Sequence, residues 1–186
     1  MFAGRTDRAI AEDVFKAHGI ENNRANWLAF RRSYLQQLRI SLPQHSGQIL
    51  TGVVELLEHL RRIPDHHLGL LTGNIREGAK EKLRHYGLWD RFDFGGFGDE
   101  SVSRDDVARA ALADATRHLS HEILPNDVYV VGDTVHDIRC ARAIGARAIA
   151  VATGGSTYDE LAAESPDHLW ADLSEWREQL ADLWRT

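Results

Sequence analysis

Two carboxylates four residues apart follow a short apolar run in the second half of the chain. Residues 128–131 are apolar or aromatic, Gly132 and Asp133 come next, and Asp137 follows. If the run is a buried strand and Asp137 lies on the first turn of the next helix, the two side chains offer hard oxygen donors within one small site. Mg²⁺ prefers such donors in proteins. The spacing therefore predicts a magnesium site at Asp133 and Asp137.

A structural interpretation competes for one of these two residues. Thr134 could cap the helix with Asp137 at its third position, as in a capping box, and this would explain Asp137 without any metal. It leaves Asp133 unexplained, because a carboxylate at the inner end of a strand is costly unless it is paired, hydrogen-bonded or bound to a cation. Asp133 is therefore the stronger functional candidate, and both interpretations of Asp137 stay open.

A second polar cluster follows an earlier apolar run. Leu70 and Leu71 precede Thr72, Gly73 and Asn74, so a hydroxyl lies at the expected strand tip. A helix that begins there would present free N–H groups to a phosphate oxygen. The competing interpretation is that Asn74 caps this helix, with a glutamate three residues later completing a capping box.

An arginine opens the long helix expected at residues 104–119. Ser103 and Asp106 have the spacing of a capping box, and an acid in the first turn suits the helix dipole. Arg104 does not suit it, since a cation at the positive end of a helix is unfavourable by ~0.3 to 1 kcal/mol. Its position indicates either an anion to be neutralised or a surface residue without function.

The pattern of apolar residues changes along the chain. Residues 6–18 and 22–40 have helical spacing and predict a helical hairpin, and 41–47 have the Pro and Gly of a linker. From residue 51 onward strands and helices alternate, which is typical of a parallel sheet covered on both faces, the α/β class. The expected helices are 51–62, 75–86, 104–119, 135–144, 157–163 and 173–184, and the expected strands are 67–72, 92–94, 127–131, 147–152 and 168–170.

Bulk properties exclude several classes of protein. The chain has 186 residues, 43% of them hydrophobic, and a formal net charge of −6. The composition is that of a globular domain, and the negative charge argues against a nucleic-acid binder, which needs a basic face. No apolar stretch of about 18 residues is present, so we expect no membrane partner. Cys140 is the single cysteine, which favours a reducing compartment, and we expect a cytoplasmic protein of unknown oligomeric state.

The motifs resemble, in order and spacing, those of the haloacid dehalogenase-like hydrolases, most closely the phosphoglycolate-phosphatase-like members. The resemblance rests on Leu71-Thr-Gly-Asn74, on Arg104 at a helix start and on residues 130–146, and residues 2–7 are similar to the segment by which that group enters its helical cap. It implies a Rossmann-like parallel sheet with an N-terminal helical cap. We expect the cap to be residues 1–46 and the α/β core to be residues 47–186.

The resemblance also implies roles for individual residues. Thr72 would hydrogen-bond the transferring phosphoryl group, with Gly73 and Asn74 in the substrate-binding loop, and Arg104 would neutralise the phosphate. Asp133 would bind Mg²⁺ directly and Asp137 would support the metal site. The implied partner is a small phosphorylated metabolite, hydrolysed through an aspartyl-phosphate intermediate.

One part of the family pattern has no counterpart in the sequence. The family's first motif is a strand ending Asp-x-Asp, which supplies the nucleophile, and residues 1–60 contain no apolar run ending in such a pair. We expect the central strand to be missing and this chain to be an inactive fragment of a normal enzyme. The alternatives are a related phosphomutase or phosphonate hydrolase, or a pseudoenzyme that binds a phosphorylated ligand without turnover.

Overall fold

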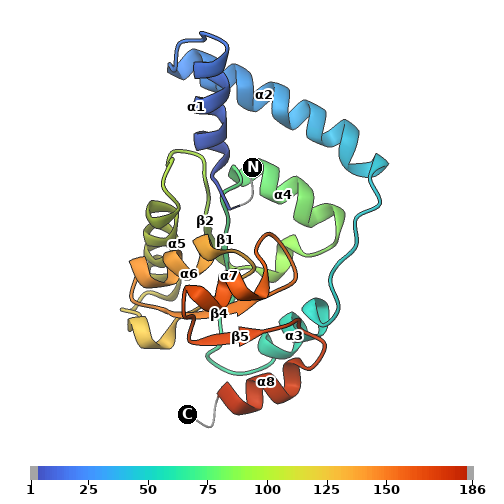
Figure 1. Ribbon diagram of the computed structural model, residues 1–186, viewed down its shortest axis with the longest axis vertical. Coiled ribbons are helices and arrows are strands. Elements are labelled where there is room, and N and C mark those ends of the chain that lie inside the picture. The colour runs from blue at the N-terminus through green and yellow to red at the C-terminus, as the bar shows by residue number, and fades with distance from the viewer. Residues whose placement is uncertain (1–3, 184–186) are drawn as a thin grey trace.

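The computed structural model describes residues 4–183, which form an α/β protein with two helices standing above the rest (Figure 1). Its helices are α1 (Asp7–Ala17), α2 (Arg24–Ser41), α3 (Val53–Leu60), α4 (Arg76–His85), α5 (Arg104–Leu119), α6 (Val135–Ala143), α7 (Tyr158–Ala163) and α8 (Trp176–Leu183). The strands are β1 (Gly69–Leu71), β2 (Phe94–Gly96), β3 (Tyr129–Gly132), β4 (Arg147–Val151) and β5 (His168–Trp170), and short 3₁₀ turns lie at Leu42–Gln44, Trp89–Arg91 and Pro125–Asp127. Every predicted helix and strand is present, with bounds shifted by a few residues. No helix of this described part is long and apolar enough to cross a membrane.

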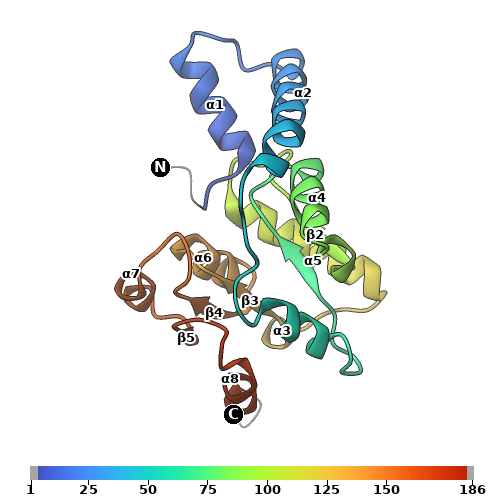
Figure 2. The same ribbon diagram turned by 90° about the vertical axis from the view of Figure 1, so that its right-hand side faces the viewer.

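The described strands form two parallel sheets. In one sheet β1 pairs with β2, with Leu71 opposite Gly96, and in the other the order is β3, β4, β5, with Gly132 opposite Ala150. The sequence predicts a single parallel sheet, whereas the described strands form two. The prediction is confirmed in its fold class and in the parallel direction of the paired strands. Figure 2 shows β1 and β2 on one side of the molecule and β3 to β5 on the other.

No strand lies between β1 and β3 within residues 4–183. Each of these strands is therefore paired along one edge in the described part of the chain, and Val131 on β3 has 50% of its surface exposed. An unpaired edge of this kind offers backbone N–H and C=O groups to a further strand. The sequence predicts that a strand is missing at this place, and this stays a prediction.

Helices cover both sheets and connect them. α5 packs on β2 and β1 and also contacts α6, which covers β3 and β4. One core cluster lies between β3, β4 and α6 and includes Ile138 and Leu161, and another joins Ile149 to Trp176 and Leu180 of α8. Because α5 contacts one sheet directly and reaches the other through α6, it helps to hold the carboxyl ends of β1 and β3 at one cavity.

The two N-terminal helices form the cap above this core (Figure 1). Thr6 caps α1 by accepting a hydrogen bond from the Ala9 N–H (3.1 Å), and Gly19 adopts a positive φ of 64° in the turn before α2. Apolar positions at helical spacing meet between the helices, where Phe15 and Trp27 are buried against Ile75 of the core. This shared cluster anchors the cap over the start of α4, and the predicted domain boundary near residue 46 stays a prediction.

Candidate active site

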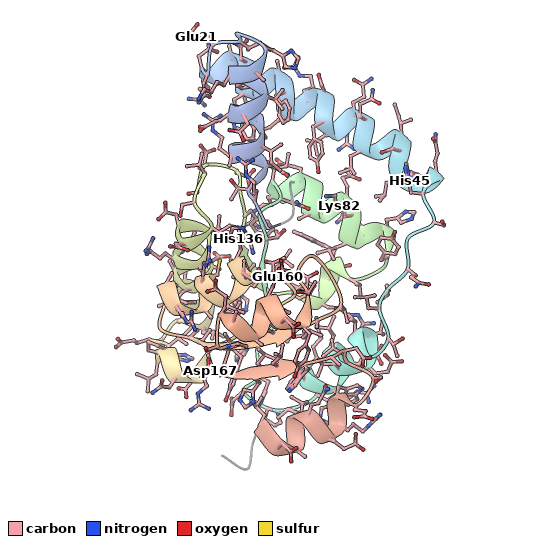
Figure 3. All side chains as sticks on the ribbon, viewed as in Figure 1. Glu21, His45, Lys82, His136, Glu160 and Asp167 are labelled. Carbon is pink, nitrogen blue, oxygen red and sulfur yellow. The ribbon has the colours of Figure 1, made fainter. Side chains whose placement is uncertain are left out.

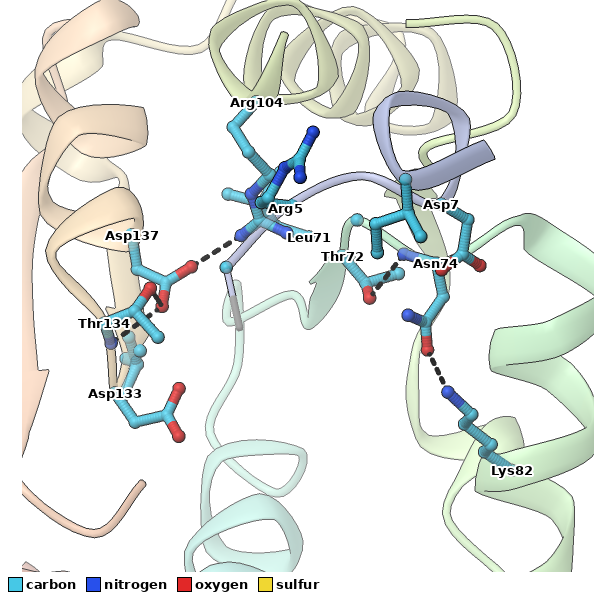
Figure 4. A pocket seen from close by; sticks show the side chains of 15 residues that line it. Arg5, Asp7, Leu71, Thr72, Asn74, Lys82, Arg104, Asp133, Thr134 and Asp137 are labelled. Atoms are coloured by element: carbon cyan, nitrogen blue, oxygen red, sulfur yellow. Dashed lines mark hydrogen bonds and ion pairs between the residues drawn. The ribbon is translucent and has the colours of Figure 1, made fainter. Parts of the chain in front are cut away.

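A cavity of about 470 Å³ lies at the carboxyl ends of β1 and β3 (Figure 4). All six residues that the sequence nominates line it: Thr72, Gly73, Asn74, Arg104, Asp133 and Asp137. Ligands of open parallel sheets bind at this edge, because the loops after the strands converge there. We call the side formed by Thr72, Gly73 and Asn74 the β1 wall and the side formed by Asp133, Thr134 and Asp137 the β3 wall.

Asp133 is held by the loop that follows β4. The Gly155 N–H donates to Asp133 Oδ2 (3.3 Å) and the Ser156 N–H donates to the Asp133 carbonyl (3.2 Å). A Cβ atom at Gly154 would overlap Asp133 Oδ2, so the loop backbone approaches the carboxylate as closely as a glycine permits. The carboxylate is therefore fixed from one side and keeps its other oxygen, Oδ1, for the cavity.

Asp137 has partners on both of its carboxylate oxygens. Oδ2 accepts hydrogen bonds from the Thr134 N–H (3.1 Å) and hydroxyl (2.8 Å), which confirms the predicted capping box. Oδ1 forms an ion pair with Arg104 Nη2 at 2.5 Å, and the two side chains are only 14% and 11% exposed. Gly132 makes room for this carboxylate, since a Cβ there would overlap the Asp137 side chain. Asp137 thus combines the capping role with a charged contact across the cavity.

Arg104 opens α5 as predicted, but the predicted capping box behind it is wrong. Ser103 is the N-cap residue without a side-chain capping bond, and Asp106 pairs with Arg109 at 2.6 Å instead. The position of Arg104 predicts a nearby anion, and among the described residues this anion is Asp137. The Arg104 Nε atom is buried and has no partner in the described residues. A buried donor without a partner is costly, so this atom is suited to an anionic ligand.

At the β1 wall, the start of α4 has other hydrogen-bond partners than the sequence predicts. The N-cap of α4 is Ile75, so the interpretation of Asn74 as the capping residue is wrong. The N–H groups of Ile75 and Arg76 donate to the carboxylates of Asp7 and Asp99, each at 2.8 Å, and are therefore not free for phosphate. The Asn74 N–H donates to the Thr72 hydroxyl oxygen at 3.2 Å. Anion binding at this wall then depends on the Thr72 hydroxyl and the Gly73 to Asn74 loop.

Three charged residues that line the cavity are not predicted as site residues from the sequence: Arg5, Asp7 and Lys82. Asp7 binds the β1 wall twice, since its N–H donates to the Gly73 carbonyl (2.7 Å) and its Oδ2 accepts from Ile75. Lys82 Nζ donates to Asn74 Oδ1 at 2.8 Å. In the sequence Asp7 has the place of an ordinary first-turn acid and Lys82 that of a helix-surface lysine, so neither carries a local signal.

Burial perturbs the pKa values of this group. Desolvation raises the pKa of Asp7, while the Ile75 hydrogen bond and the charge of Lys82 act in the opposite direction. Desolvation likewise lowers the pKa of Lys82, against the favourable charge of Asp7. Tyr34 of α2 lies near the same carboxylate, and burial followed by the Asp7 charge raises its pKa to about 12. Ionisable groups in a cleft with perturbed pKa values often mark a functional site.

The donor set fits a weakly held hard cation with one direct carboxylate from this chain. Asp133 presents a carboxylate oxygen to the cavity, whereas both oxygens of Asp137 are engaged by Thr134 and Arg104. Residues 4–183 contain no group of three or more His, Cys, Asp or Glu side chains placed to hold a metal ion. A cation bound here would take its remaining ligands from water, from a phosphorylated ligand or from a further carboxylate.

Comparisons with known proteins identify the family. A HAD-hydrolase-like family model matches residues 106–176. A 5'-nucleotidase of Pseudomonas aeruginosa is 30% identical over 173 residues, which are 92% of this chain and 74% of that protein. The chain belongs to the haloacid dehalogenase-like hydrolases. Its class is therefore that of hydrolases acting on phosphate esters.

Further relatives of the same family agree with this assignment. A phosphoglycolate phosphatase of Synechococcus elongatus is 30% identical over 138 residues, and the match spans 74% of this chain and 62% of that protein. A hydrolase from Pseudomonas syringae has a similar structure, with a TM-score of 0.72 at 18% identity over 97% of this chain and 80% of that one. At this identity the structural match shows a shared fold alone.

Proposed function

We propose that this chain carries the phosphoryl-binding and metal-binding parts of a Mg²⁺-dependent phosphomonoester hydrolase of the phosphoglycolate-phosphatase type. The supporting observation is that Thr72, Arg104 and Asp133 come from three separate elements and line one cavity. A hydroxyl, a cation and a metal-binding carboxylate are the groups that stabilise a transferring phosphoryl group. The ligand would be a small phosphorylated metabolite.

Within this proposal the two acids of the β3 wall have different roles. Asp133 would hold Mg²⁺ with its carboxylate, and Asp137 holds Arg104 and the start of α6 in place. Bound Mg²⁺ would supply charge stabilisation to the phosphoryl oxygens. Arg104 donates to the same oxygens, and its ion pair with Asp137 fixes the direction of the guanidinium group before a substrate arrives.

The nucleophile in this mechanism is a carboxylate on a strand between β1 and β3. Each of these two strands has an unpaired edge in the described residues, and the carboxyl ends of both line the cavity. The carboxylate oxygen attacks phosphorus while the bond to the ester oxygen breaks, and a second acid gives its proton to the leaving alkoxide. Water then attacks the aspartyl-phosphate, which releases phosphate and regenerates the carboxylate. We propose that an upstream Asp-x-Asp strand of the intact enzyme supplies both acids.

The experiment joins this chain to an upstream segment that contains such a strand and measures hydrolysis of p-nitrophenyl phosphate. We expect the joined protein to be more soluble than the 186-residue chain and to show Mg²⁺-dependent turnover. Asp133→Asn should abolish turnover, and Asp127→Asn, an exposed acid in a 3₁₀ turn, should not.

Robust turnover by the chain alone, abolished by Asp133→Asn, would contradict the proposed nucleophile. Binding of phosphate without turnover by the joined protein would favour the second candidate, a phosphate-binding pseudoenzyme. The observation that favours this second candidate is that the described strands form two separate sheets.

The buried free thiol of Cys140 supports our further proposal of a reducing, cytoplasmic location.

A further inference from the structure

The side-chain amide of Asn74 has an accepting end and a donating end, and one neighbour decides which end meets the cavity. Lys82 Nζ donates a hydrogen bond to Asn74 Oδ1 at 2.8 Å. An ammonium group only donates, so it can bond to the amide oxygen but not to the amide nitrogen. Figure 4 shows Oδ1 of Asn74 toward Lys82 and the amide nitrogen on the other side, facing the cavity. The N–H groups of this nitrogen are therefore available to an anionic ligand.

The backbone of the same residue orients the Thr72 hydroxyl. The Asn74 N–H donates to Thr72 Oγ1 at 3.2 Å. A hydroxyl has one hydrogen to donate and two lone pairs that accept. The bond from Asn74 uses a lone pair, so the hydroxyl hydrogen is left for another acceptor. Thr72 Oγ1 and Asn74 Nδ2 thus form two donors from one loop, which we call the donor pair.

The group that orients the amide is itself held between the cap and the core. Asp7 is the charged neighbour of Lys82, and it accepts the Ile75 N–H at 2.8 Å while its own N–H donates to the Gly73 carbonyl at 2.7 Å. Figure 3 shows Lys82 below the cap helix α2 and above the strands. A hydrogen bond from a charged donor is stronger than one between neutral groups. Lys82 therefore favours one orientation of the amide more strongly than a neutral donor would.

Lys82 differs from the other two cations that line the cavity. Arg104 is paired with Asp137 at 2.5 Å and Arg5 with Asp13 at 2.7 Å, so both bond to carboxylates. The hydrogen bond of Lys82 goes to a neutral amide instead, and that amide lies at the β1 wall. A bond of this kind fixes the direction of the amide without cancelling a charge.

We propose that Lys82 is a positioning residue, which holds Asn74 Oδ1 so that the donor pair of Thr72 and Asn74 faces a phosphoryl oxygen. Lys82 acts through Asn74 and does not touch the ligand. The inference rests on the proposed function and deepens it, because it assigns the direction of the β1 wall to a residue of α4. Without the ammonium group the amide can turn over and present its oxygen, which repels a phosphoryl oxygen.

A double-mutant cycle tests whether Lys82 acts through Asn74. The ligand is ethyl phosphate, titrated calorimetrically into the chain with Mg²⁺ present. Lys82→Met should weaken binding about 10-fold, the effect expected when one hydrogen bond to a charged group is lost. In an Asn74→Ala background, Lys82→Met should change the affinity by less than about 2-fold, because the side chain through which it acts is gone. Additive effects of the two substitutions would mean that Lys82 meets the ligand itself, and this would overturn the inference.

Two further variants serve as controls for charge and for folding. Lys82→Arg keeps a side chain that only donates and should retain most of the affinity. Lys80→Met removes the same charge from the same helix, beside the Trp89 ring, and should leave the affinity unchanged. Mg²⁺ binding without ethyl phosphate should be the same in all these variants, since the β3 wall is not altered. An equal loss of affinity in Lys80→Met would overturn the inference, because it would assign the effect to net charge.

The side-chain amide of Asn74 provides a direct readout. In ¹H–¹⁵N spectra its two amide protons should shift when ethyl phosphate is added to the wild-type chain and to Lys82→Arg, but not when it is added to Lys82→Met. The absence of a shift in the wild type would overturn the inference, and so would an unchanged affinity of Lys82→Met. The proposed function fails separately, if Arg104→Ala leaves the affinity for ethyl phosphate unchanged.

Discussion

The two walls of the cavity are held in place in different ways. On the β3 wall, Asp137 is fixed by Thr134, three residues away, within one helix start. On the β1 wall, the residues beside Thr72 are fixed by Asp7 and Asp99, which lie 68 and 23 residues from the amides they bind. The β3 wall is therefore held by a local capping box together with contacts inside the core, to Arg104 and Gly155, whereas the β1 wall depends in addition on Asp7 of the cap.

This difference suggests a division of labour. The charges that would meet a metal ion and a phosphoryl group belong to a rigid part of the core, since the Asp137 side chain has hydrogen bonds or an ion pair on both oxygens. On the other side of the cavity the lining residues come from the loop after β1, from α4 and from the cap helix α1, whose Asp7 accepts the Ile75 N–H. Changes on the β3 wall should therefore have large effects on stability, and changes on the β1 wall smaller ones.

The largest effect is expected from Asp137→Ala, which leaves Arg104 as an unpaired, 11% exposed charge and removes the capping box. We expect a loss of about 3 to 5 kcal/mol in the free energy of unfolding, as for other broken buried pairs. Urea denaturation measures this loss. The double variant Arg104→Met with Asp137→Ala should be less destabilised, and a single-variant loss close to that of an exposed ion pair would contradict the rigid β3 wall.

A smaller effect is expected where the loop after β4 approaches Asp133. Gly154→Ala should destabilise the protein by about 1 to 3 kcal/mol, because the added methyl group overlaps the Asp133 carboxylate. In an Asp133→Ala background the same substitution should cost much less, since the overlapping atoms are gone. Thermal unfolding of the four proteins of this double-mutant cycle gives the coupling energy. Additive effects of the two substitutions would show that the loop does not hold Asp133.

The smallest effect concerns Asp7 on the β1 wall and depends on pH. Burial raises the pKa of Asp7 above 3.8, so its ionised form is disfavoured in the folded state, and its contribution to stability is lost as pH rises through the raised value. Asp7→Asn keeps an oxygen for the Ile75 N–H without the charge. The stability of the wild type relative to this variant, measured by urea denaturation, should fall as pH rises above 3.8. A rise in the stability of the wild type relative to Asp7→Asn would mean that Lys82 and Ile75 outweigh burial.

The contrast between the walls also explains what the sequence could predict. Periodicity and the spacing of Gly, Pro and polar residues locate every described helix and strand, because these signals are local. The Thr134 to Asp137 capping box is predicted for the same reason. The separation into two sheets is not predicted, since strand pairing depends on contacts between distant segments.

The β1 wall shows where local patterns are insufficient. Asn74 and a glutamate three residues later have the spacing of a capping box, yet the amides of the α4 start are bound by Asp7 and Asp99. The same holds for Ser103, whose expected partner Asp106 bonds to Arg109. Lys82 has no sequence signal, because only the fold brings it beside Asn74. At the start of α4 tertiary contacts replaced the local contacts that the pattern favours, whereas at the start of α5 a different local contact, from Arg109 to Asp106, did so.

The central claim is that both walls act on one ligand, and the coupling between Mg²⁺ and ethyl phosphate tests it most directly. Calorimetric titration of Mg²⁺ with and without saturating ethyl phosphate measures this coupling free energy. We expect ethyl phosphate to tighten Mg²⁺ binding by about 10-fold or more, since Mg²⁺ completes its coordination with phosphate oxygens. Asp133→Asn and Arg104→Ala should each abolish the coupling, and Asp127→Asn should preserve it. Independent binding of the two ligands to the wild-type chain would contradict a shared site.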